Sequence, residues 1–146
     1  MIKEKMKVDV AVSALDRLKE IHERFVQEIA ARSQTPINGG SLTVEEDQIL
    51  ATCLGVSLRV VHRPIARNGE LEALEYAFIA QYGKEELAVW HLYLEGNGVL
   101  YTDSSATVRF CDFNNAYVAN KIIAALADAL LRSSVFAPHK PFGSAP

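Results

Sequence analysis

Apolar residues recur along residues 8–31 with the three- and four-residue spacing of an amphipathic helix. Charged residues occupy the opposite side of the same predicted helix. A helix of roughly 24 residues has a length of about 36 Å, which is long for a globular protein. We therefore expect this helix to lie across a whole sheet or to project towards a partner. Its apolar stripe consists of Ala11, Ala14, Leu15, Leu18, Ile21, Phe25 and Ile29.

A short second helix is predicted after a loop. Residues 33–42 form the loop, because they include Pro36 and two consecutive glycines. Thr43 and Glu46 have the spacing of a capping box, in which both side chains satisfy N–H groups at the start of a helix. Gly55 suits the end of that helix, where a left-handed residue is common. We therefore expect a short helix between Thr43 and Gly55.

Four or five antiparallel strands are predicted in the middle of the chain. The clearest alternation of apolar and polar residues covers residues 56–66, 71–82 and 87–95. Asn68–Gly69 is a strong hairpin signal, because both central residues of a type I′ turn have positive φ. A fourth strand is expected to begin at Val99. Polar residues at 103–105 then predict either a bulge or a turn into a fifth strand at residues 107–111.

A second long helix is predicted to begin near Asn114. Strands grouped between helices indicate an α+β fold, here an antiparallel meander with three helices packed mainly on one sheet face. We expect the first and last helices to cover the face that carries Trp90. Residues 1–136 are predicted to form a single domain, and residues 137–146 an extended, proline-rich tail.

The composition narrows the class of protein. The chain has 146 residues, of which 49% are hydrophobic and 23% charged, as in ordinary globular domains. Its net charge of −3 argues against nucleic acid as a partner and against attraction to anionic membranes. Cys53 and Cys111 are too far apart in the sequence for a cysteine metal motif, and two cysteines make no disulfide framework. With no signal peptide pattern and no apolar segment of spanning length, we expect a soluble, cytoplasmic protein.

No stretch completes a catalytic, cofactor or metal motif. His22–Glu23 begins like a zinc-protease helix, but Val26 stands where the second histidine is required. Gly96 and Gly98 have the spacing of a phosphate-binding loop, but they join two predicted strands and precede no helix. We therefore expect no cofactor and no metal, and the sequence favours a protein that is not an enzyme.

His22 has an unusual position for a polar residue. It lies in the middle of the apolar stripe of the first predicted helix, between Leu18 and Phe25. One interpretation is a core or interface histidine with one satisfied hydrogen bond. The other is a pH-sensitive or ligand-contacting group in a pocket beneath the helix.

The predicted sheet face opposite Trp90 combines basic, aromatic and aliphatic residues. Because side chains alternate between the two faces of a strand, Arg59 and Arg63 point away from the predicted core. This face is a solvated surface, an interface with a second copy or another protein, or a site for a small molecule or anion. If Glu75 pairs with an arginine across the strands, the charges are structural. The candidate interface residues are Arg59, Arg63, Glu75, His91 and Tyr93.

Two functional hypotheses follow from these patterns, and a third, nucleic-acid binding through Arg59, Arg63 and Arg67, is disfavoured by the net charge. The first is a non-catalytic binding or protein-interaction domain that acts as a homodimer through the mixed Arg/His/Tyr face, or through the exposed flank of the long helix. The alternative is a small-ligand-binding protein, or an enzyme, with a cavity between the sheet and the helices. The possible lining of that cavity is His22, His62, Tyr76 and Trp90.

Overall fold

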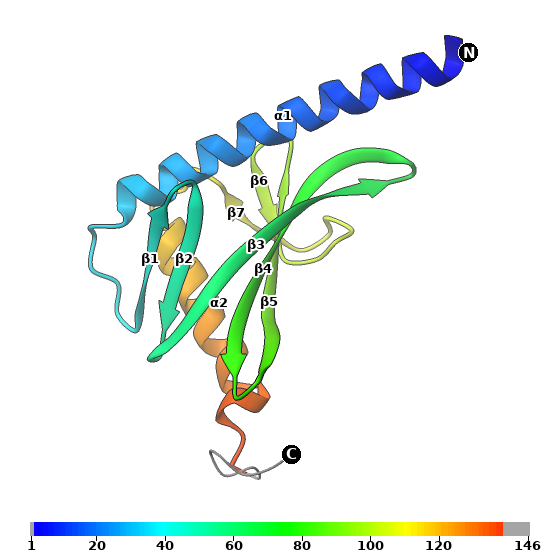
Figure 1. The fold of residues 1–146 in the computed structure, drawn as a ribbon. Helices are drawn as coiled ribbons and strands as arrows, with labels where there is room; N and C mark the ends of the chain where they lie inside the picture. Colours follow the sequence, from blue (N-terminus) through cyan, green and yellow to red (C-terminus); the bar gives the residue numbers. More distant parts are fainter. Residues whose placement is uncertain (1, 139–146) are drawn as a thin grey trace.

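Two α-helices cover one face of a seven-stranded antiparallel sheet in the computed structural model, which describes residues 2–138 (Figure 1). Helix α1 spans Ile2–Arg32 and helix α2 spans Val118–Leu131, and a 3-10 turn at Ser134–Phe136 follows. The fold is therefore α+β with a long N-terminal helix, as the sequence predicts. Residues 139–146, the larger part of the predicted tail, lie outside the described residues.

The strands follow one another in the sheet in the order of the sequence. They are β1 (Gly40–Glu45), β2 (Gln48–Cys53), β3 (Val56–Arg67), β4 (Glu70–Tyr82), β5 (Glu85–Glu95), β6 (Val99–Tyr101) and β7 (Arg109–Asp112). Each strand pairs antiparallel with the next. Such a meander needs only short connections, since antiparallel neighbours are joined by tight turns. As predicted, Asn68 and Gly69 both have positive φ in the turn between β3 and β4.

The segment between Thr43 and Gly55 is a β-hairpin, so the predicted second helix is wrong. Strand β1 ends at Glu45 and pairs with β2, which begins at Gln48. The residues of this hairpin that are buried recur at every second position within a strand: Leu42 in β1, then Ile49, Ala51 and Cys53 in β2. A period of two buries one side of a strand, whereas a helix would distribute these residues around its axis. Gly55, with φ +79°, lies in the turn between β2 and β3.

The sheet has more strands than the four or five predicted. The hairpin adds two of them. The predicted fourth strand is divided, because β6 ends at Tyr101 and β7 begins at Arg109. Asp103 holds the loop between these strands, since its carboxylate accepts hydrogen bonds from the backbone N–H groups of Thr107 and Val108. Of the two predicted alternatives, a bulge or a turn into a further strand, the structure has the turn.

Both long helices differ from the prediction at their starts. Helix α1 begins at Ile2, before the predicted start near residue 8. Helix α2 begins at Val118, after the predicted start near Asn114. The preceding turn is stabilised by Asn115, whose side-chain oxygen accepts a hydrogen bond from the backbone N–H of Tyr117. Neither helix, within residues 2–138, has a segment both long and apolar enough to cross a membrane.

One face of the sheet forms the hydrophobic core together with the two helices. Along β3, Leu58 and Val60 are buried, whereas Arg59 and Arg63 are exposed, as the alternation predicts. Trp90 of β5 lies on the core face and is partly buried. The helix residues that reach deepest into this core are Phe25, Ile29, Val118, Ile122, Ile123, Leu126 and Leu130.

The β3–β4 hairpin extends beyond the neighbouring strand β2 (Figure 1). Strand β2 pairs with β3 only as far as Arg59, whereas β3 continues to Arg67. The remainder of β3 is therefore an open sheet edge on that side. Helix α1 contacts β1, β2 and β4, and its N-terminal part runs past the sheet (Figure 1). A cleft results where the middle of α1 passes this open edge.

Candidate functional site

A hydrogen bond between His22 and Tyr76 joins helix α1 to strand β4. Nδ1 of His22 lies 2.7 Å from the hydroxyl oxygen of Tyr76. Tyr76 is only 1% exposed, and its ring packs edge-on against Phe25 of the same helix. A buried hydroxyl group without a partner costs about 1–3 kcal/mol. The histidine therefore satisfies a polar group that the core would otherwise leave unpaired.

His62 on β3 completes a group of three stacked rings. His62 and Tyr76 are opposite each other in the β3–β4 register, so both side chains face α1. The ring centroids of His62 and His22 are 4.0 Å apart, and the ring planes differ by 16°. Three of the four residues in the predicted pocket lining thus lie together. Trp90 does not join them, because its ring packs against Phe78 and Phe110 elsewhere on the core face.

Two hollows open on either side of the histidine pair. The first has a volume of about 250 Å³ and lies between α1 and the β3–β4 hairpin. The second has a volume of about 300 Å³ and lies between α1 and the start of β2. Both are lined by His22, His62 and Asp47. The first also has apolar walls and the charged residues Lys19 and Glu23. The apolar side chains along this first hollow are Leu15, Leu18, Val26, Pro64 and Leu74.

Asp47 reaches the site from the tight turn between β1 and β2. Glu46 and Asp47 have φ values of +49° and +64°, so both central residues of the turn are left-handed. Turns of this kind are normally built from asparagine and glycine. A left-handed backbone costs a residue with a side chain roughly 1–2 kcal/mol. This turn therefore holds a carboxylate beside the two histidines at the expense of backbone strain.

The surroundings keep both imidazoles neutral at neutral pH. The pKa of His22 is lowered to about 4, chiefly by burial and also by the nearby His62, whereas Asp47 acts in the opposite direction. Partial burial also lowers the pKa of His62. Burial raises the pKa of Tyr76, which stays protonated. A neutral imidazole has one N–H donor and one nitrogen acceptor, so this group offers hydrogen bonds without net charge.

The arrangement suits binding better than metal coordination. Within residues 2–138, no group of three His, Cys, Asp or Glu side chains is placed to hold a metal ion. The two imidazoles are stacked face to face, whereas chelating histidines direct their nitrogens at one point. Flat rings bordered by apolar walls and a few polar groups are typical of small-molecule sites.

The predicted interface residues lie on the opposite sheet face, where their charges pair with one another. Nε of Arg63 donates a hydrogen bond to Glu75 over 2.7 Å, and the Tyr93 hydroxyl donates to the same carboxylate over 3.0 Å. The Arg63 hydrogen bond lowers the pKa of Glu75. Arg59 forms an ion pair with Glu86 of β5, and His91 is half-buried. Glu75 therefore pairs with an arginine across the strands, which is the case in which the sequence analysis treats these charges as structural.

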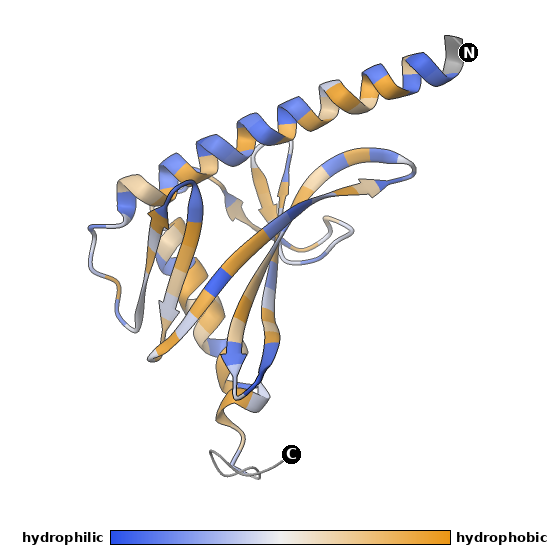
Figure 2. Cartoon of the chain, in the orientation of Figure 1, coloured by the Kyte–Doolittle hydropathy of each residue, from blue (hydrophilic) through white to orange (hydrophobic). Residues whose placement is uncertain are grey.

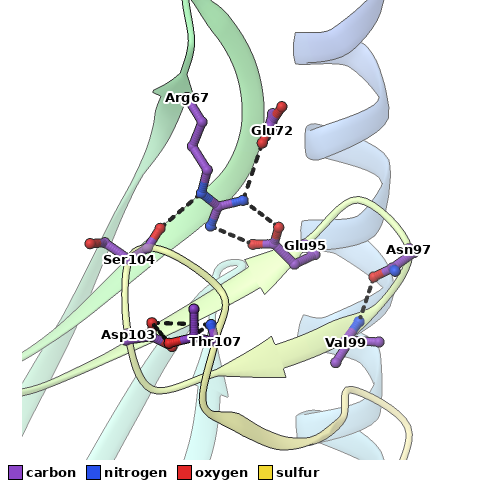
Figure 3. A network of polar contacts seen from close by, with 8 residues as sticks. All are labelled: Arg67, Glu72, Glu95, Asn97, Val99, Asp103, Ser104 and Thr107. Atoms are coloured by element: carbon purple, nitrogen blue, oxygen red, sulfur yellow. Dashed lines mark hydrogen bonds and ion pairs between the residues drawn. The ribbon is translucent and has the colours of Figure 1, made fainter.

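Arg67 is the centre of a second polar network on this face (Figure 3). Its guanidinium group binds both carboxylate oxygens of Glu95 and also contacts Glu72. Nε of Arg67 donates to the backbone carbonyl of Ser104 over 2.8 Å. This contact ties the loop between β6 and β7 to the end of the β3–β4 hairpin. The network is structural, because all its groups come from this chain and satisfy one another.

Two residues of the site were not singled out from the sequence. Asp47 falls within the predicted second helix, and Lys19 has no part in the sequence predictions. The polar run at Glu45–Gln48, between two apolar alternating segments, is the signal for the turn that carries Asp47. Lys19 lies one turn from Leu15 along α1, a spacing that places both on the same wall of the first hollow.

Comparison with protein-family models, with curated proteins and with solved structures finds no match for this chain. The function is therefore inferred from the residues of the site themselves.

Proposed function

We propose that this protein binds a small ligand in the cleft between α1 and the β3–β4 hairpin. The observation that carries the proposal is the His22–Tyr76 hydrogen bond with His62 stacked on it, at the point where two hollows meet. A neutral, half-buried imidazole beside open space supplies a hydrogen-bonding group of the kind that orients a ligand. The strained turn at Asp47 supports the same proposal, because strain of this kind is common at binding sites.

The proposed ligand has a flat apolar part and a hydrogen-bonding edge. The ring of His62 is exposed at the rim, so a further aromatic ring has a surface to stack on. Leu15, Pro64 and Leu74 supply apolar contacts to the aromatic ring of the ligand. Lys19 at the rim favours an anionic group on the ligand, while Asp47 accepts hydrogen bonds.

Association through the Arg/His/Tyr face, the first hypothesis from the sequence, remains a prediction and is our second candidate function. The charged groups there already have partners within the chain, at Arg59, Arg63 and Arg67. A partner would therefore have to displace existing ion pairs to use them. We place ligand binding first for this reason.

A fluorescence titration with anilinonaphthalene sulfonate tests the proposal, since this probe combines flat aromatic rings with one anionic group. We expect saturable binding at one site on the intact chain. His62→Ala removes the stacking surface, and Leu15→Trp fills the first hollow, so each should weaken binding at least several-fold. His91→Ala is the matched control, because it removes a half-buried histidine from the opposite face.

Circular dichroism of each variant ensures that a loss of binding does not come from unfolding. The proposal is wrong if the wild-type chain shows no saturable binding, or if His62→Ala and Leu15→Trp bind the probe as tightly as His91→Ala does.

A further inference from the structure

The first part of α1 is an exposed helix that carries large apolar residues. Every residue from 4 to 13 is exposed. Figure 1 shows this segment running past the sheet, and Figure 2 shows apolar positions along it. Valine is a poor helix former, and a helical segment of this length is marginal in water without a packing partner. The apolar residues concerned, all between 52% and 61% exposed, are Met6, Val8, Val10 and Val12.

Two of these valines continue a stripe that begins at the candidate site. At about 100° per residue, Val8, Val12, Leu15 and Lys19 fall within a sector of about 60° around α1. Leu15 and Lys19 line the first hollow. The stripe therefore runs without interruption from the cleft to the projecting segment, and nothing within residues 2–138 covers its outer end.

We propose that a second copy of this chain covers the stripe, with the two α1 helices paired antiparallel. A two-fold axis presents the same surface from both copies, so each helix offers the other an identical apolar stripe. The antiparallel direction also places the two sheets at opposite ends of the paired segment. The pairing is independent of the ligand-binding proposal.

Charge complementarity selects the second copy as the partner. In the antiparallel register that sets Val8 of one copy against Val12 of the other, Lys5 of each copy comes beside Asp16 of the other. Lys5 and Asp16 lie on the same flank of the stripe, and like flanks meet when two identical helices run antiparallel. Both residues are exposed, and no ion pair among residues 2–138 involves either of them. The symmetric pair thus supplies two opposite-charge contacts, against one approach of like charge between the two Asp9 side chains further round the same flank.

The paired segment is short, which sets the expected affinity. An overlap of residues 5–16 is roughly 18 Å long. Its contact area falls below the roughly 1,200 Å² of standard stable complexes, so we expect a dissociation constant in the micromolar range or weaker. In the same register, the N-terminal part of α1 from the other copy comes alongside Leu15 and Lys19, at the open end of the first hollow.

Sedimentation equilibrium of the full chain, from low micromolar to near-millimolar concentration, measures this association. We expect a monomer–dimer equilibrium for the wild type. Lys5→Glu or Asp16→Lys alone should weaken it roughly threefold to tenfold, because each creates two like-charge contacts. The double variant should recover the wild-type constant, since the pairs are then reversed.

Val8→Glu should abolish the dimer, and Val108→Glu is its matched control. The two valines have similar exposure, 60% and 57%, but Val108 lies in the loop before β7. The proposal is overturned if the wild type stays monomeric at every concentration, if the double charge reversal fails to restore association, or if Val108→Glu weakens it as much as Val8→Glu.

Discussion

The hydroxyl group of Tyr76 is hydrogen-bonded to Nδ1 of His22, and this contact ties strand β4 to helix α1 at the cleft. A fully buried tyrosine and a half-buried histidine thus satisfy each other across the interface between helix and sheet. The same histidine presents its ring face to His62 and to the open hollows. One residue therefore contributes both to the packing of α1 and to the candidate site.

Tyr76→Phe tests the structural part of this contact. The substitution leaves the imidazole of His22 without its partner, so we expect the free energy of unfolding to fall by about 1–2 kcal/mol. Denaturant unfolding measures the change. Tyr101→Phe is the control, because Tyr101 is partly buried on β6 and no hydrogen bond of its hydroxyl group is found within residues 2–138. Equal losses in both variants would contradict a special role for the His22–Tyr76 bond.

The low pKa of His22 predicts that acid destabilises the fold. The unfolded chain takes up a proton on this histidine near pH 6.5, whereas the folded chain resists protonation until about pH 4. Between these values the unfolded state binds more protons, so stability decreases as the pH falls through this window, by up to about 3 kcal/mol. Denaturant unfolding at several pH values measures this slope.

His22→Gln separates this effect from other titrations. Glutamine keeps a hydrogen-bonding group near Tyr76 but does not titrate, so the slope above pH 4 should become markedly shallower. The remaining slope comes from His62, whose pKa is also lowered by burial, and, towards pH 4, from Glu75, whose pKa is lowered by its hydrogen bond from Arg63. An unchanged pH dependence in His22→Gln would show that the histidine does not control the acid sensitivity.

Arg67→Ala should destabilise the protein far more than Arg63→Ala. The Arg67 side chain is 19% exposed and that of its partner Glu95 is 15% exposed, whereas Arg63 is 72% exposed. Removing Arg67 leaves a half-buried carboxylate and the Ser104 carbonyl without their donor, at a cost of about 1–3 kcal/mol. Arg63→Ala should change stability little, because the carboxylate of Glu75 keeps the hydroxyl group of Tyr93 as a donor. Thermal and denaturant unfolding of the two variants decide the comparison.

Asp47→Gly should separate stability from binding. Glycine adopts the left-handed backbone of this turn without steric cost, so the variant should be more stable by about 0.5–1 kcal/mol. It also removes a carboxylate that lines both hollows, so binding of the fluorescent probe should change. Paired measurements of unfolding and titration test both parts. A variant that loses stability would mean that the Asp47 side chain outweighs the strain.

The predictions from sequence were most accurate where a residue pair is compatible with few backbone conformations. Asn68–Gly69 was placed in a turn because few other pairs accept positive φ at both positions, and the turn is there. The hairpin at β1 and β2 was missed because Thr43 and Glu46 match a helix start locally. Its turn is made by Glu46 and Asp47, a polar pair without the glycine or asparagine of the usual two-residue turns. Only the pairing of these residues within the sheet decides between a helix and a hairpin for this segment.

The candidate site was predictable in part for a similar reason. His22 is conspicuous because it interrupts an apolar helix stripe, and the register then sets His62 opposite Tyr76. Trp90 was grouped with them by residue type and strand parity. Parity states which face a side chain occupies but not where along the face it lies. The wide sheet places Trp90 beside Phe78 and Phe110 instead.

Pro64 has a consequence for the solubility of this fold. In the β2–β3 register, the backbone N–H and C=O groups of even-numbered β3 residues point towards β2. Because β2 pairs with β3 only as far as Arg59, these groups lie at an unpaired edge beyond that residue. An unpaired edge is a template for strand addition and aggregation. Pro64 has no N–H group to donate, which leaves a gap in the row that an incoming strand would need. The cleft can therefore stay open beside a bare strand without recruiting other chains into a continuous sheet.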